Sequence, residues 1–129
     1  MGVSRHETTR HLVRLKEFQV ADKRRQLGQL DLMIAEFDRM AGELDAQIAS
    51  EERKAGITDV NHFAYPTFAR AARLRRDNLK NSQNDLLAQK AGVAVSLDEA
   101  ETELAKAQAM DARDMRQREA TSDRRAMIG

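Results

Sequence analysis

The chain has 129 residues, a net charge of +1, and a composition that is 33% charged but only 4% aromatic. Such a composition is typical of long helices and coiled coils, and it disfavours a compact globular core, which normally relies on aromatic and β-branched side chains. The near-balance of 22 basic and 21 acidic residues argues against a protein whose main task is to coat nucleic acid.

The first predicted helix spans residues 5–55. Ser4 and Glu7 fit the S-x-x-E capping box that opens many helices. Gly56 is the usual residue just beyond a helix C-terminus, after Arg53 and Lys54 in the last turn. Between these ends, apolar residues recur at alternating spacings of three and four: Leu27, Leu30, Ile34, Phe37, Ala41, Leu44 and Ile48. This spacing places them on one narrow stripe, which is the seam for a single partner helix.

A shorter apolar stripe near the N-terminus is out of phase with this seam. It consists of Leu12, Leu15 and Phe18, whereas a backward extension of the seam would use Val20 and Val13. We therefore expect a phase shift between residues 18 and 23, or the end of tight pairing there. The three out-of-phase side chains should then be partly exposed and available to a partner.

The turn is predicted over residues 56–65 and the second helix over about 66–125. Pro66 suits the first position of a helix, because the N–H that proline lacks has no intrahelical partner there. A second heptad ladder follows, and its members are Leu79, Leu86, Val93, Leu97, Ala100, Leu104 and Ala107. Its first half is less apolar, since one row of the seam carries Arg76, Gln83 and Lys90. Polar residues in a seam weaken it but help to fix its register.

These patterns predict an all-α fold in which two long helices form an antiparallel coiled-coil hairpin, a single unit over residues 1–129. The preferred register sets Glu51 beside Arg76, because it pairs the acidic break in the first seam with a basic break in the second. The alternative register differs by one heptad, leaves Arg76 facing Leu44, and gives a slightly tighter loop.

No feature of the sequence suggests catalysis. His6 and His11 are five residues apart, so they do not share a helix face as a metal-binding pair would. The chain has no cysteine and no glycine-rich phosphate loop, and a two-helix fold encloses none of its carboxylates. We therefore expect no enzyme activity, no cofactor, no metal and no small-molecule substrate.

The sequence also lacks membrane and secretion signals. No apolar stretch approaches the roughly 20 residues that a bilayer-spanning helix needs. Residues 1–17 are charged throughout and contain no signal-peptide core. We expect a soluble, cytoplasmic protein.

The predicted turn concentrates aromatic and basic side chains. Phe63, Tyr65 and Phe68 lie within six residues, and four arginines follow them: Arg70, Arg73, Arg75 and Arg76. The structural interpretation is that the aromatic rings close the end of the hairpin, which we favour for at least one of them. The functional interpretation is a protein-docking surface, because aromatic residues and arginine dominate interface hot spots. A nucleic-acid contact is a weaker third interpretation, because acidic residues lie nearby.

Several stretches of the chain are similar to one known family. Residues 14–20 read RLKEFQV, residues 33–40 read MIAEFDRM, and residues 55–59 read AGITD. Residues 62–67 read HFAYPT, a phrase that heptad patterning alone does not produce. In these stretches the chain resembles the FliJ family, above all its alphaproteobacterial branch, and the likeness runs from about residue 14 to residue 87.

FliJ proteins are small cytoplasmic components of the flagellar type III export apparatus, and this resemblance implies bacterial motility and protein transport as the context. It implies an antiparallel coiled coil whose paired N- and C-terminal ends engage the ring of the export ATPase, FliI. Another part of the coil contacts the export-gate membrane protein FlhA, and handling of export chaperones is also attributed to the family. We expect the ATPase at the free ends, near Leu12, Leu15 and Phe18, and the gate at the turn.

Two other classes of function remain open. The first is a nucleic-acid-binding helical arm, similar to the basic hairpins of some synthetases, which the net charge of +1 disfavours. The second is a generic coiled-coil oligomerisation or adaptor protein. Binding to export ATPase rather than to tRNA at moderate salt would separate the first from an export component.

Overall fold

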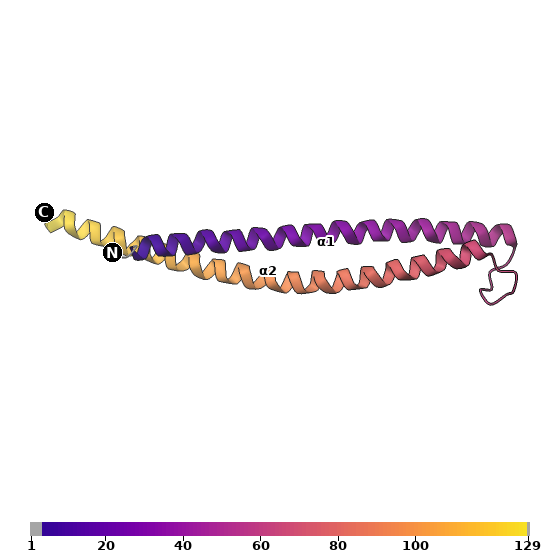
Figure 1. Ribbon diagram of the computed structural model, residues 1–129. Coiled ribbons are helices and arrows are strands. Elements are labelled where there is room, and N and C mark those ends of the chain that lie inside the picture. The colour runs from indigo at the N-terminus through magenta and orange to yellow at the C-terminus, as the bar shows by residue number, and fades with distance from the viewer. Residues whose placement is uncertain (1–3, 129) are drawn as a thin grey trace. The chain divides into compact units, whose positions relative to one another are not determined.

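The computed structural model describes residues 4–128, and these residues form two long helices joined by a loop. Helix α1 spans Arg5–Ala55 and helix α2 spans Thr67–Ile128. The helices contact each other along an antiparallel hairpin (Figure 1), and no strand occurs in the described part of the chain. The predicted fold class is therefore confirmed.

The ends of the helices follow the local sequence. The Ser4 hydroxyl accepts a hydrogen bond from the Glu7 N–H at 3.2 Å and so caps α1. At the other end, Gly56 adopts a φ of 69°, and the N–H groups of Gly56 and Ile57 both donate to the Glu52 carbonyl. Only glycine adopts this left-handed conformation without strain, which is why α1 ends there. The Pro66 carbonyl accepts the first bond of α2, from the Arg70 N–H.

The chain divides into two compact units, each containing a segment of both helices. The loop unit comprises residues 28–92, with the end of α1, the loop and the start of α2. The terminal unit comprises residues 1–27 and 93–129, with the start of α1 and the rest of α2.

The seam of the loop unit contains an apolar cluster that forms its core. Leu44, Ile48 and Ala72 form a buried cluster against which Leu79 packs. Ala41 and Leu86 are buried farther along the same seam. Burial of such aliphatic side chains contributes about 25 cal/mol per Å² of apolar surface, so this seam is the main source of stability in the unit.

The seam of the terminal unit keeps the same three-four spacing but contains more polar residues. Val20 is buried in α1 and Ala107 in α2. In α1, Lys16 and Lys23 are partly buried at seam positions, and Thr9 is buried at a seam position nearer the N-terminus. The expected phase shift between residues 18 and 23 is therefore wrong. The heptad continues because long lysine stems cover the seam while their ammonium groups reach solvent.

The preferred register is also wrong. Arg76 Nη1 contacts Asp45 Oδ1 at 3.0 Å, and Lys90 Nζ contacts Asp31 Oδ1 at 2.7 Å. Both contacts belong to the alternative register, in which Arg76 lies opposite the Leu44 region. Glu51 pairs instead with Lys54 on its own helix. The Arg76 side chain is long enough to leave the interface and reach Asp45 at its edge, so Arg76 needs no acidic residue directly opposite it in the seam.

Within residues 4–128, neither helix contains a segment that is long and apolar enough to cross a membrane.

Candidate partner-binding surfaces

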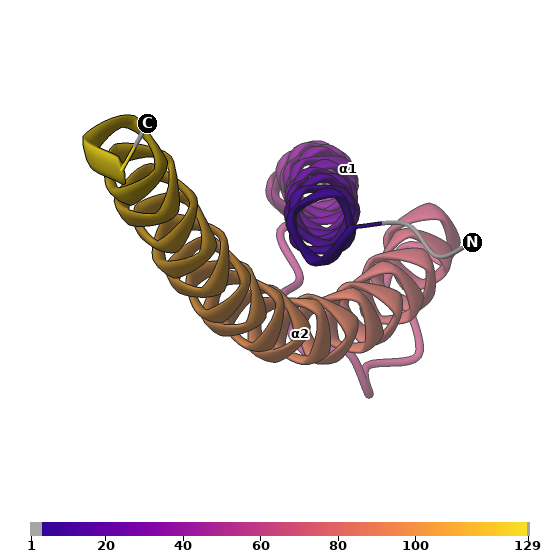
Figure 2. The same cartoon turned by 90° about the vertical axis from the view of Figure 1, so that its left-hand side faces the viewer.

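The terminal unit ends in a stretch of α2 that α1 does not cover. Arg5 at the start of α1 lies level with Asp114, where its Nε is 3.9 Å from Asp114 Oδ1. Helix α2 continues to Ile128 (Figures 1 and 2), and every described side chain after Asp114 is exposed. The seam positions that follow Asp114 at three-four spacing are Arg118, Thr121 and Arg125. The seam of α2 therefore continues beyond Asp114, where no partner helix lies against it among the described residues.

A polar layer closes the seam just before this uncovered stretch. Thr9 Oγ1 donates to Asp111 Oδ1 at 3.4 Å, and Thr9 and Asp114 are both buried. His6 Nδ1 and Asp114 Oδ2 are buried without a hydrogen-bond partner in the described structure. Buried polar atoms are nearly always paired, so this layer is an unstable way to end a helical interface.

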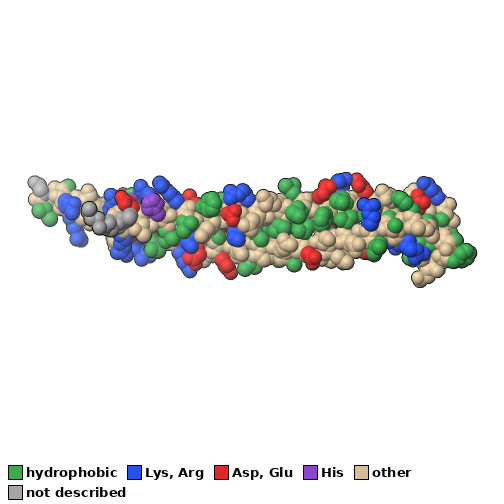
Figure 3. All heavy atoms as spheres, in the orientation of Figure 1, with side chains coloured by type: hydrophobic (Ala, Val, Ile, Leu, Met, Phe, Trp, Pro, Cys, Tyr) green, Lys and Arg blue, Asp and Glu red, His purple; other side chains and the backbone are tan. Residues whose placement is uncertain are grey.

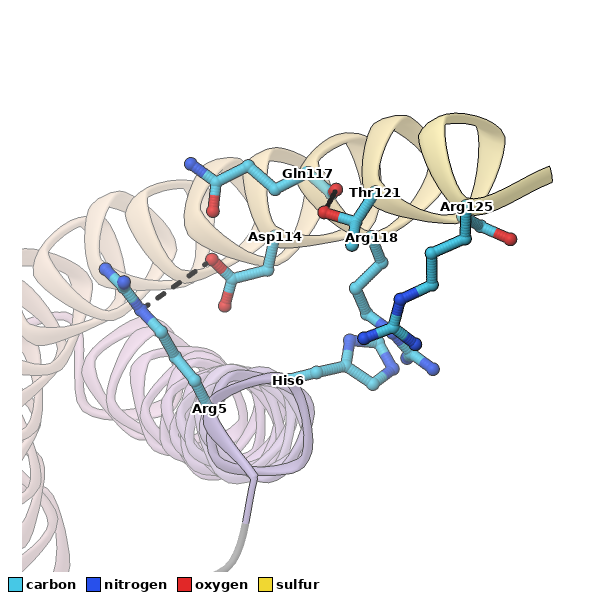
Figure 4. Close-up of a pocket in the computed structure, with 8 residues that line it drawn as sticks. Arg5, His6, Asp114, Gln117, Arg118, Thr121 and Arg125 are labelled. Atoms are coloured by element: carbon cyan, nitrogen blue, oxygen red, sulfur yellow. Dashed lines mark hydrogen bonds and ion pairs between the residues drawn. The ribbon is translucent and has the colours of Figure 1, made fainter. Parts of the chain in front are cut away.

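The polar layer and the uncovered stretch form one open cleft, which we call the terminal cleft (Figure 4). His6 projects from α1 toward the side of α2 that carries Arg118 and Arg125, while Asp114 lies between the two helices. The lining residues are Arg5, His6, Asp114, Gln117, Arg118, Thr121, Ser122 and Arg125. The cleft thus presents three guanidinium groups and several neutral hydrogen-bond donors, against the single carboxylate of Asp114, which Arg5 pairs. This excess of positive charge suits carboxylates or other anionic groups.

The charge of the surrounding surface agrees with that preference. Residues 5–16 carry four basic and one acidic side chain, and residues 113–128 carry five basic and three acidic ones. These two segments together have a charge of +5, although the whole chain has a charge of +1. Lys and Arg side chains gather around this end of the terminal unit in Figure 3.

The three out-of-phase residues of α1 lie in the same unit. Leu15 and Phe18 are exposed, with 51% and 63% of their surface accessible, whereas Leu12 is partly buried. The guanidinium of Arg25 lies over the Phe18 ring, 6.0 Å from its centroid. Leu15 and Phe18 are thus accessible to a partner, as expected, while Leu12 contributes in part to the fold.

At the loop, the aromatic and basic residues divide into two groups. Tyr65 is buried, and its hydroxyl accepts a hydrogen bond from Arg73 Nε at 2.7 Å. Arg73 Nη2 also pairs with Glu52 at 3.3 Å, which ties the end of α1 to the start of α2. The bond to Tyr65 is the largest cause that raises the pKa of Arg73 above its ordinary value. Tyr65 and Arg73 therefore close the loop, as the structural interpretation predicted for at least one aromatic residue.

Arg76 belongs to the same structural group. It bonds Asp45 across the hairpin and Asp77 on its own helix, and its hydrogen bond to Asp45 is the leading cause of a raised pKa. The other residues of the predicted cluster remain accessible: Phe63, Phe68, Arg70 and Arg75. We call these four the tip surface.

Sequence reasoning placed a partner contact at the free ends of the hairpin but did not identify the terminal cleft, although part of its signal was present. The heptad of the second helix continues through Arg118, Thr121 and Arg125. Because these residues are polar, the sequence does not distinguish them from ordinary surface residues. The buried, unpaired atoms of His6 and Asp114 depend on the register and so could not be inferred. No protein family, curated protein or solved structure matches this chain.

Proposed function

We propose that this chain is a non-enzymatic, cytoplasmic component of the bacterial flagellar type III protein export apparatus. In this role it couples an export ATPase to the export gate and assists export chaperones. The proposal is supported by the resemblance of residues 14–87 to the FliJ family. It is also supported by the helical hairpin, which is the fold that this resemblance implies. The observation that carries it is the basic terminal cleft, because a coupling protein needs an uncovered surface for its ATPase.

The terminal cleft has the properties of a docking surface for an acidic partner. Its seam positions continue the spacing of the covered seam, so a helix or loop of a partner could take the place that α1 leaves open. Arg118 and Arg125 form no ion pair within the described chain, so their charges are available. A partner could also supply hydrogen bonds to the buried atoms of His6 and Asp114. These features favour the terminal unit as the contact for the ATPase ring.

Charge reversal tests this assignment directly. The variant carries Arg118→Glu and Arg125→Glu, and its matched control carries Arg53→Glu and Lys80→Glu, two exposed basic residues of the loop unit. We expect the variant to bind purified export ATPase at least about tenfold more weakly and to lose its stimulation of ATP hydrolysis. The control should retain both, and circular dichroism should show both proteins to be helical.

The result can also reject the proposal. Equal stimulation by the variant and the control would exclude the terminal cleft as the ATPase contact. Binding of tRNA at moderate salt, abolished by the same charge reversal, would instead favour the nucleic-acid-binding arm.

We further propose that the tip surface contacts the export gate. Phe63 and Phe68 are the exposed aromatic residues of the loop region, and Arg70 and Arg75 accompany them. Aromatic residues and arginine are the side chains that most often dominate protein interfaces. The two proposed contacts lie in different compact units, so a substitution in one unit should spare the partner of the other.

A further inference from the structure

The loop is closed by side chains other than Phe63. Gly56 turns the backbone, Tyr65 is buried against Arg73, and Arg70 Nη2 donates to the Val60 carbonyl at 3.0 Å. Phe63, by contrast, has 96% of its surface exposed. A large apolar side chain that adds nothing to loop closure keeps its hydrophobic surface available for a partner.

The Phe63 ring is nevertheless held in place. It stacks on the His62 ring with centroids 4.8 Å apart and an interplanar angle of 22°. His62 is itself fixed, because its Nδ1 accepts a hydrogen bond from the Ala64 N–H at 3.0 Å. Asp59 Oδ1 accepts a further bond from the Asn61 N–H, which orders the preceding turn. A ring that is already oriented loses little conformational entropy when it binds, and this is the property of an interface anchor.

We infer that Phe63 is the anchor of the tip surface and that it inserts into an apolar cavity of a partner protein whose rim carries carboxylates. The acidic rim follows from Arg70, which is exposed, bonds the Val60 carbonyl of the loop and forms no ion pair within the described residues. The neighbouring Arg73 and Arg76 are already paired with carboxylates of the hairpin. The inference rests on the proposed function, which names the export gate as the protein that supplies the cavity.

Other occupants fit these observations less well. Partition into a bilayer uses several apolar side chains and gains little from one ring in a fixed orientation. A second copy of the chain docked tip to tip would bring the Arg70 side chains of the two copies together, and like charges repel. A shaped protein cavity is therefore the occupant that the tip surface favours.

The test compares Phe63→Ala with Leu32→Ala, since Leu32 is another highly exposed apolar residue of the loop unit, at 74%. The binding probe is the purified cytoplasmic domain of the export-gate protein from the same organism. We expect Phe63→Ala to weaken binding at least about tenfold and Leu32→Ala to leave it unchanged. Neither substitution should lower the melting temperature, and both variants should still stimulate the export ATPase.

The outcomes separate this inference from the proposed function. Unchanged affinity of Phe63→Ala, or a melting temperature lowered as far as in Tyr65→Phe, would overturn the inference while ATPase stimulation still supports the proposed function. If the gate domain does not bind even the wild-type chain, the proposed gate contact fails. The inference about Phe63 is then tested by itself, with a photo-crosslinking phenylalanine placed at position 63 and, as the control, at position 32. The inference would be supported by a protein that crosslinks from position 63 and not from position 32, and that, once purified, binds Phe63→Ala more weakly than the wild-type chain. Crosslinks to lipid or to a second copy, or none above the control, would overturn it.

Discussion

The terminal unit and the loop unit use the same heptad spacing but fill it with different side chains. In the loop unit, Leu44, Ile48 and Ala72 are buried together, and the closure by Tyr65 completes the unit. In the terminal unit, the buried seam positions include Thr9 and Asp114, and lysines occupy others. Spacing alone therefore sets the geometry of a helical pair, whereas the residues at the seam set its stability.

This difference has a functional consequence. A seam with buried, unpaired polar atoms opens at a lower free energy than an apolar one. The terminal unit is thus suited to exchange its own contacts for those of a partner, while the loop unit is suited to hold the hairpin together and to present a fixed tip surface. Substitutions in each unit should reveal this contrast.

The largest effect should come from the apolar cluster of the loop unit. Leu44→Ala removes a buried side chain that contacts Ile48 and Ala72, and we expect the free energy of unfolding to fall by about 2–4 kcal/mol. Leu15→Ala, at an exposed position of the terminal unit, should change it by less than about 0.5 kcal/mol. Urea denaturation measures both. Equal losses would show that Leu15 is packed as tightly as Leu44, against its exposure in the terminal unit.

The closure of the loop should be the next most sensitive feature. Tyr65→Phe removes the hydroxyl that accepts a bond from Arg73, and we expect a loss of about 1–2 kcal/mol because the donor is charged. Tyr65→Phe in an Arg73→Ala background should then have little further effect, which a double-mutant cycle would measure. Full additivity would show that the two side chains act independently.

The polar layer predicts a change in the opposite direction. Asp114→Leu replaces a buried carboxylate, one of whose oxygens is unpaired, and should stabilise the terminal unit by about 1 kcal/mol. Hydrogen exchange of the first turns of α1 should slow accordingly, with Glu119→Leu at an exposed position of α2 as the control. Faster exchange in Asp114→Leu would indicate that its contact with Arg5 contributes more than its burial costs.

Glycine substitutions test whether the helices contain positions that packing does not require. A Cβ added at Gly42 or Gly92 would meet nothing within 4 Å, so Gly→Ala at either site should stabilise the chain by about 1 kcal/mol. The same change at Gly56 should destabilise it, because the φ of 69° strains any side chain there. Thermal melts of the three variants would distinguish these cases.

The smallest effect concerns a surface pair of the loop unit. A hydrogen bond from Arg39 lowers the pKa of Glu36 below 4.5, so the ionised form stabilises the folded state. This contribution is present above pH 4.5 and is lost as the pH falls through the lowered pKa. An NMR titration of Glu36 should show the shift, and Arg39→Gln should return the midpoint to its ordinary value.

The sequence by itself determined the secondary structure and the fold class. Ser4, Gly56 and Pro66 mark the helix ends through local backbone chemistry, and the three-four spacing fixes which face of each helix meets the other. These features depend on residues close together in the chain, so they can be read without knowledge of the partner helix.

Tertiary structure alone decided the register and the roles of individual polar residues. A heptad seam pairs almost equally well when it slides by seven residues, so the choice depends on specific contacts such as Arg76 with Asp45 and on closure of the loop by Tyr65. The same is true of the terminal cleft, since the unpaired atoms of His6 and Asp114 arise only once α1 and α2 are aligned. Long-range contacts of this kind have no signature in local spacing, because each partner is an ordinary polar residue until the other is placed beside it.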